Sequence, residues 1–312
     1  MNPRFRLVFP PYFVLLVWSV VSAMSFNGPV MPLYVASLGI GVGGWSALVA
    51  SWALGMLLSE WVWGSLSDRA DRRLLLVLSV LGTSVLSLLF TIHSFVLAFI
   101  VLEFAIGALG VAVGPITRAC VSDEVPKTTM GFHASLWWSF FTVGRVIGPL
   151  VGAYIAQMWS FADSFWASTI LSIGLSAFIL LSFPAGRKMS KVANFSIMRD
   201  VKLILNLKSA RLLFVTTIFV FASRTLITSF LPLYASEQIK MSTVNVGVLY
   251  SLFSGVCLTV PALFRRPFTL SANARHICSW NRNSHLFTPI GNGTGCGPRR
   301  NAGSSNWHLW FL

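Results

Sequence analysis

The chain has 312 residues, of which 55% are hydrophobic and only 10% carry a charged side chain. Soluble domains are about one quarter charged, so this composition excludes a soluble enzyme and a disordered protein and predicts that lipid solvates most of the chain. The net charge of +14 is better explained by basic cytoplasmic loops than by nucleic-acid binding, and no nucleic-acid partner is expected.

The N-terminal apolar segment predicts two membrane helices rather than one. Residues 7–59 contain no charge, and this stretch is far longer than the roughly 20 residues that one span needs. The glycine-rich stretch at 39–44 divides it into helices at about 11–36 and 45–66, and a polar turn at 67–73 follows. Further helices are predicted at about 74–93, 96–117, 131–157, 164–183, 211–233 and 245–264.

These segments predict an all-α, polytopic membrane bundle of about eight helices, because long apolar runs satisfy their backbone in lipid as helices. The predicted organisation has four parts. They are a six-helix bundle at 1–183, a cytoplasmic linker at 184–208, a partial second bundle at 209–264 and an aberrant basic tail at 265–312.

Basic residues near the helix ends predict the orientation. Alternate loops, beginning with the N-terminus, hold fourteen Lys and Arg, whereas the opposite loops hold only Lys240. We therefore expect a multi-pass protein of the plasma membrane, with the N-terminus and the 184–208 linker in the cytoplasm.

The chain also repeats itself at an offset of 200 residues. The segment MPLYVAS at 31–37 returns as LPLYAS at 231–236, and Gly55 returns as Gly255. The seventh and eighth helices therefore correspond to the first and second, which is typical of transporters built from repeated halves.

The strongest local motif is GSLSDRADRR at 64–73, between the second and third helices. Gly64 permits close helix packing, Asp68 offers a carboxylate near the N-terminus of the next helix, where the dipole favours it, and the arginines face the cytoplasm. The alternative interpretation is a basic stop to a helix. The arginines of the motif are Arg69, Arg72 and Arg73.

This loop resembles the Gly-x-Leu-Ala-Asp-Arg-x-Gly-Arg-Arg/Lys motif of the major facilitator superfamily, with Asp71 replacing the second glycine. The resemblance covers residues 7–264. It implies a secondary transporter of twelve helices in two pseudo-symmetric bundles that rock around a central site. It also implies that the loop is a gating latch in which Asp68 and Arg69 act in conformational switching.

A second motif, GRVIGPLVGA at 144–153, resembles the family's antiporter motif. It contains Gly144, Gly148, Pro149 and Gly152, with Ser135 at the position of the first glycine and Ala153 at that of the last. The alternative is ordinary packing of small residues. The resemblance favours the proton-driven drug-efflux branch of the family.

Three ionisable residues lie near the middle of predicted helices, where charge is costly and function is the default hypothesis: Glu103, Arg145 and Arg224. A carboxyl in a low dielectric favours its neutral form, so Glu103 could carry a proton. Alternatively, Glu103 and Arg145 form a structural ion pair between neighbouring helices. The family has an arginine at the position of Glu103. Asn27, beside Gly28-Pro29, is a candidate substrate contact at a helix break.

The last segment departs from the repeat. Residues 264–273 should hold a second loop motif but contain no Gly or Asp, and no apolar span follows. We expect a frameshifted or truncated gene. The tail residues His276, Cys278, His285 and Cys296 match no zinc spacing, so no metal site is predicted.

The sequence as a whole predicts proton-coupled multidrug export rather than enzymatic activity. The expected partners are the lipid bilayer, protons and a small, lipophilic molecule, with no cofactor. Two alternatives remain. One is a non-functional remnant of a transporter, and the other is a membrane sensor or subunit that keeps the fold without transport.

Overall fold

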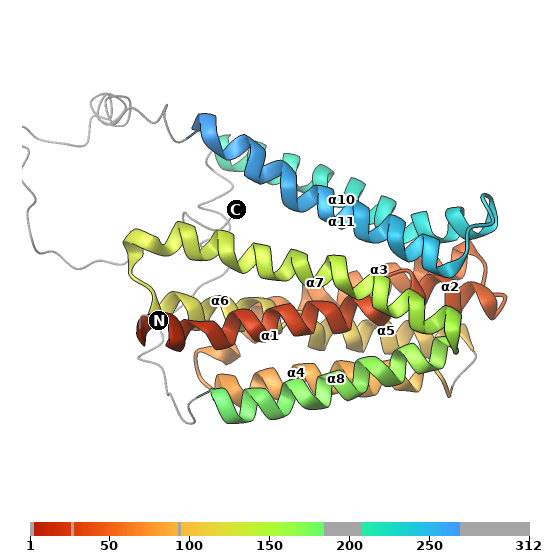
Figure 1. The fold of residues 1–312 in the computed structure, drawn as a ribbon, viewed down its shortest axis with the longest axis horizontal. Coiled ribbons are helices and arrows are strands. Elements are labelled where there is room, and N and C mark those ends of the chain that lie inside the picture. The colour runs from red at the N-terminus through yellow and green to blue at the C-terminus, as the bar shows by residue number, and fades with distance from the viewer. Residues whose placement is uncertain (1–2, 26–27, 93–94, 184–207, 269–312) are drawn as a thin grey trace, which may run out of the picture.

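A computed structural model of the protein describes residues 3–25, 28–92, 95–183 and 208–268. Within these ranges every regular element is a helix, which confirms the all-α prediction. Seven segments of the described chain are long and apolar enough to cross a bilayer, and α11 begins with a shorter apolar stretch at Thr243–Val256. The protein is a multi-pass membrane helix bundle (Figure 1). Its helices are α1 (Pro3–Ser25), α2 (Val30–Ser37), α3 (Val42–Ser67), α4 (Arg72–Leu89), α5 (Val96–Gly110), α6 (Val113–Glu124), the 3₁₀ turn η1 (Lys127–Thr129), α7 (Met130–Met158), α8 (Phe161–Ser182), α10 (Lys208–Glu237) and α11 (Thr243–Phe268).

The first and fourth predicted helices are each divided in two. α1 ends at Ser25 and α2 begins at Val30, and Pro29 between them has no N–H to donate to the preceding turn. The fourth predicted helix breaks between α5 and α6 and continues to Glu124, seven residues beyond its predicted end at 117. That boundary was wrong because Arg118 was interpreted as a loop residue, whereas it lies inside α6.

The connection from α2 to α3 depends on one glycine. Gly39 has a φ of +76°, in the left-handed region that residues with a side chain rarely adopt. Its N–H donates to Ala36 O at 2.9 Å and that of Ile40 donates to Val35 O at 3.3 Å. These bonds close the C-terminus of α2 and allow α3 to begin at Val42.

The first six predicted helices form one bundle in which small residues bring backbones together. α1 packs against α7 and α8, α3 against α5, and α4 against α8. A side chain added at Gly55 would overlap the backbone of Phe104, and one added at Gly107 would overlap that of Trp52. Close backbone approach of this kind is the main source of helix association in lipid.

Buried hydroxyl groups provide further contacts within this bundle. Ser84 Oγ of α4 donates to Ser172 Oγ of α8 at 2.5 Å, and Thr169 of α8 donates to Ser84 O at 3.3 Å. Ser164 of α8 reaches Met24 O of α1 at 3.2 Å. Such bonds satisfy polar groups that would otherwise be exposed to hydrocarbon.

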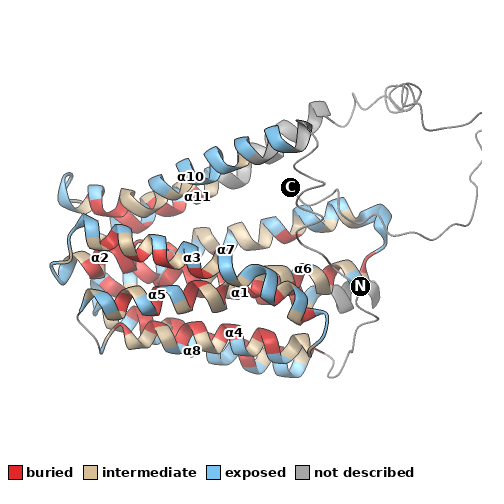
Figure 2. Cartoon of the chain, turned by 180° about the vertical axis from the view of Figure 1, so that it is seen from behind, coloured by how far each residue is buried: buried red, intermediate tan, exposed pale blue. Residues whose placement is uncertain are grey.

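α10 and α11 lie at one side of the bundle and approach it mainly at one end, near α2 and α3 (Figure 1). α11 packs against α7 and α10 against α2. The indole of Trp45 donates to Ser229 O at 2.9 Å, and Val244 N–H donates to Gln157 Oε1 at 2.8 Å. Figure 2 shows that most of α10 is exposed along its length, in contrast to the buried faces of the bundle.

The two repeated segments meet at this end. Leu33, from MPLYVAS in α2, forms a buried cluster with Ala235, from LPLYAS in α10, and with Val246 of α11. The repeat therefore places its two copies against each other, in the way that related halves of a pseudo-symmetric protein meet at their axis.

Three sequence predictions fall wholly or partly outside the described residues. Asn27 lies outside them. Of the 184–208 linker only Lys208 is described, as the first residue of α10. The eighth helix was predicted to end at 264, but α11 continues to Phe268, so the tail begins later than expected. Residues 269–312, with the histidines and cysteines considered for zinc, are not described.

Candidate gating site

The bundle has two chemically different ends. We call one the loop-motif end, which comprises residues 64–73, α6 and the first turns of α7. The other we call the aromatic end, where α2, α4, α5 and α8 meet through the rings of Tyr34, Phe90, Phe99, Phe161 and Phe165.

The loop motif itself is a tight connection between α3 and α4. The N–H groups of Arg69 and Ala70 both donate to Leu66 O, at 3.1 and 2.8 Å, and close the end of α3. Asp71 is the N-cap of α4, because its Oδ1 accepts from Arg73 N–H at 2.9 Å. Asp68, which was predicted to offer a carboxylate near the start of this helix, lies four residues before Arg72. Asp68 is the C-cap residue of α3.

Gly64 also differs from its prediction. A side chain at this position would meet nothing within 4 Å, so Gly64 does not mark a close helix approach. Its carbonyl instead accepts from Ser67 Oγ at 2.9 Å, which fixes the last turn of α3.

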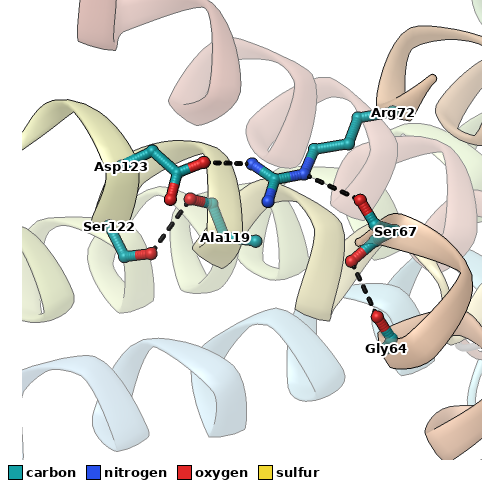
Figure 3. A network of polar contacts seen from close by, with 6 residues as sticks. All are labelled: Gly64, Ser67, Arg72, Ala119, Ser122 and Asp123. Atoms are coloured by element: carbon teal, nitrogen blue, oxygen red, sulfur yellow. Dashed lines mark hydrogen bonds and ion pairs between the residues drawn. The ribbon is translucent and has the colours of Figure 1, made fainter. Parts of the chain in front are cut away.

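Arg72 connects three helices at the loop-motif end (Figure 3). Its Nη1 lies 2.5 Å from Asp123 Oδ2 of α6, and its Nε donates to Ser67 O at the end of α3, at 3.2 Å. Both charged side chains are largely shielded, with 12% and 22% of their surface exposed. Arg72 also interacts with the thiol of Cys120, one turn before Asp123.

Arg72 and Asp123 each lie at a helix end that disfavours their own charge. Arg72 is the first residue of α4, where the positive helix end disfavours a cation, and Asp123 is in the last turn of α6, where the negative end disfavours an anion. Pairing across the helices offsets both penalties. If α4 and α6 moved apart at this end, both penalties would return. We refer to this contact as the Arg72–Asp123 latch.

A second cation of α6 lies beside the latch. The guanidinium of Arg118 is 4.4 Å from the ring centroid of Trp137 in α7, and Glu60 of α3 lies close enough to Arg118 to attract it electrostatically. α6 is thus linked by charge to α3 and α4 and by an aromatic ring to α7.

The antiporter-like motif lies on α7 and packs against α1. Side chains at Gly144, Gly148 and Gly152 would overlap Ser19 Oγ, Val20 O and the Met24 backbone respectively. On a different face of α7, Pro149 and Ala153 pack against Gly247 of α11. Small residues therefore allow α7 to lie close to two neighbouring helices.

The mid-membrane ionisable residues do not form one cluster. Glu103, with 4% of its surface exposed, lies on α5, which packs mainly against α3 and α4. Arg145 lies on α7, with its guanidinium 5.6 Å from the ring centroid of Phe141. Arg224 is half-buried on α10. In the described part of the chain, the alternative ion pair between Glu103 and Arg145 does not form, because α5 and α7 are not close neighbours.

Sequence reasoning missed Asp123, Arg118 and Trp137. All three lay outside the motifs, and the first two fell in what was predicted as a loop. The only available signal was the pair Arg118 and Asp123, whose opposite charges are five residues apart in the sequence. A helix places residues at this spacing on different faces, so the pair does not itself indicate an interaction. A further contact, Tyr12 Oη to His133 Nδ1 at 2.6 Å, joins α1 to α7 nearby and was also not anticipated.

Comparison with known proteins places these features in context. The sequence profile of the Major Facilitator Superfamily matches residues 13–274. Among curated proteins, the chain is 28% identical over 250 residues to "Multidrug resistance protein MdtG" of Enterobacter lignolyticus. The alignment covers 78% of this chain and 58% of that protein. The chain is 29% identical over 252 residues to the protein of the same name in Serratia proteamaculans, in an alignment that covers 78% and 59%. The chain thus spans about three fifths of the length of these relatives.

Proposed function

The chain belongs to the major facilitator superfamily, and from this premise we propose that it acts in proton-coupled export of a small, lipophilic molecule by alternating access. The observation that carries the proposal is the Arg72–Asp123 latch, which joins the family's loop motif to α6. The relatives named for multidrug resistance support a small-molecule substrate. Transport rather than catalysis is the corresponding activity.

Glu103 is the proton carrier in this proposal. It is buried at mid-membrane and, within the described residues, forms no salt bridge. A carboxyl without a cation partner gains little from remaining charged in a low dielectric and takes up a proton readily. Asp68, Arg69 and Arg73 accompany the latch at the loop, whereas Arg145, Arg224 and Asn27 remain candidate contacts on the substrate pathway.

The basic-residue pattern supports an N-terminus in the cytoplasm. The loop-motif end is then the cytoplasmic end, because α1 begins there and α3 ends there. A protease-sensitive tag at the N-terminus should be cleaved in everted membrane vesicles and protected in intact cells. The reverse pattern would contradict this orientation.

Uptake of ethidium into everted vesicles with an acidic interior tests the function. We expect uptake that collapses with the proton gradient, that falls at least tenfold in Asp123→Asn and that loses its dependence on the gradient in Glu103→Gln. Asp163→Asn is the matched control, because Asp163 is an exposed carboxylate at the N-terminus of α8, at the opposite end of the bundle. Unchanged proton-dependent uptake in Glu103→Gln would contradict the carrier assignment.

Two other results would favour the alternatives. Ethidium binding without uptake would indicate a sensor or subunit, and failure of the chain to accumulate as folded protein would indicate a remnant.

A further inference from the structure

Two stacked rings on α7 lie between two arginines. Trp137 and Phe141 have ring centroids 5.9 Å apart and planes inclined by only 13°. The Arg118 guanidinium covers the Trp137 ring at 4.4 Å, and that of Arg145 lies 5.6 Å from the Phe141 ring. This arrangement runs from Arg118 of α6 to Arg145 of α7. Arg145 lies at the start of residues 144–153, which we call the glycine–proline segment.

The orientation of Trp137 is fixed by its neighbours. The side chain is 4% exposed, and its indole N–H donates to Thr117 Oγ1 at 3.0 Å. Thr117 is fully buried and its hydroxyl donates to Val113 O at 2.7 Å. Two consecutive residues of α6 therefore hold the Trp137 side chain of α7. Thr117 accepts a hydrogen bond from the edge of the indole ring, and Arg118 lies over its face, where the ring attracts a cation.

The contact between α6 and α7 is otherwise narrow, because α6 packs mainly against α1. α6 is a single helix of 12 residues that carries Thr117 and Arg118 near its middle and Asp123 in its last turn. A displacement of Asp123 away from Arg72 therefore moves the residues that hold Trp137. On its other side, α7 faces α1 with glycines, which offer no side chain to resist a small sliding motion.

We propose that Trp137 is a positioning residue that couples the Arg72–Asp123 latch to the glycine–proline segment of α7. The Trp137–Phe141 ring pair transmits the position of α6 to Arg145 and the glycines that follow it. This inference deepens the proposed gate and rests on the proposed function, but its test needs neither substrate nor transport.

Hydrogen–deuterium exchange of the full chain, purified in detergent, measures the coupling directly. In the otherwise unmodified protein, Asp123→Asn should raise exchange about fivefold in residues 113–124 and also in residues 130–143. In a Trp137→Leu background, the same substitution should still raise exchange in 113–124 but should add nothing in 130–143. Trp159→Leu is the matched control and should leave the coupling intact, because Trp159 is 68% exposed at the C-terminal end of α7 and stacks edge-on against Tyr154, away from the ring pair.

Conservative substitutions separate positioning from general stability. Arg118→Lys keeps a cation over the ring and should preserve the coupling, whereas Arg118→Met should abolish it. This pair also provides the comparison if Trp137→Leu does not fold. An equal effect of Asp123→Asn on residues 130–143 with and without Trp137, or no effect in either, would overturn the proposal. Coupling without ethidium uptake would contradict the proposed function alone, and uptake without coupling would contradict this inference alone.

Discussion

The aromatic end and the loop-motif end of the bundle both contain a buried apolar cluster, but they differ in the contacts that supplement it. At the aromatic end, Phe90, Phe99 and Phe165 are fully buried, and Tyr34 Oη donates to Phe90 O at 3.0 Å. α10 and α11 also approach the bundle here. The loop-motif end is also packed by buried apolar side chains, such as Leu75, Ile116 and Val121, but it adds the Arg72–Asp123 pair and a cation–ring contact. α10 and α11 draw away from α6 and α7 at this end (Figures 1 and 2).

This difference agrees with the proposal that the loop-motif end is the end that opens. Apolar packing at the aromatic end is non-directional and is lost only when many contacts separate together. The Arg72–Asp123 pair is directional, and each partner lies at the helix end that disfavours its charge. In the proposed transport cycle, the aromatic end serves as the pivot, and the loop-motif end has directional contacts that a small movement can break and remake.

Removal of a central ring from the aromatic end should have the largest effect on stability. Phe165→Ala leaves a cavity between Tyr34 and Phe90 and should lower the free energy of unfolding by about 3 kcal/mol. This value is near the lower limit for the cores of soluble proteins, because lipid also solvates an apolar ring. Thermal unfolding in a mild detergent measures this loss. The control is Phe132→Ala, since Phe132 is 57% exposed at the loop-motif end. Equal losses in the two variants would remove the distinction between the ends.

Forcing α1 and α7 apart should have the next largest effect. In Gly152→Val, the new side chain overlaps the backbone of Met24, and overpacking of this kind costs about 2 kcal/mol. Gly174→Val on α8 is the control, because a side chain there meets nothing within 4 Å. Both unfolding midpoints are measured in detergent. A Gly152→Val midpoint equal to that of Gly174→Val would mean that the helices do not lie this close.

Breaking the latch should cost less stability than either of the two preceding changes. Asp123→Asn removes one charge from a partly shielded pair and should lower the free energy of unfolding by about 1 kcal/mol. The loss should shrink as salt concentration rises, because ions screen the pair. Addition of Arg72→Gln to Asp123→Asn should cause little further loss. Strictly additive losses in the double variant would show that the two residues do not interact.

The smallest effect is expected where α3 meets α10. Trp45→Phe keeps an aromatic ring, although a smaller one, and removes the hydrogen bond to Ser229 O. Single interhelical bonds in membranes contribute about 0.6 kcal/mol. The loss should appear as faster hydrogen exchange in residues 226–233, with residues 72–89 of α4 unchanged. Faster exchange throughout the chain would indicate that α10 is an integral part of the bundle.

The sequence alone determined the helical class, the approximate spans and the position of the loop and antiporter-like motifs. These features depend on local composition. A run of apolar residues must form a helix in lipid, and glycine or proline interrupts it wherever it occurs. The prediction missed the end of α6 because it treated Arg118 as a boundary. A charged side chain can remain inside a helix when its cation packs over an aromatic ring, as that of Arg118 does over Trp137.

Only the tertiary structure decided which of these residues meet. It paired Arg72 with Asp123, assigned the cap of α4 to Asp71, and separated Glu103 from Arg145. Helical periodicity gives the face on which a residue lies but not the helix that this face meets. In lipid, neighbours are selected by close backbone approach at small residues and by a few polar contacts, and these depend on the positions of all the helices together.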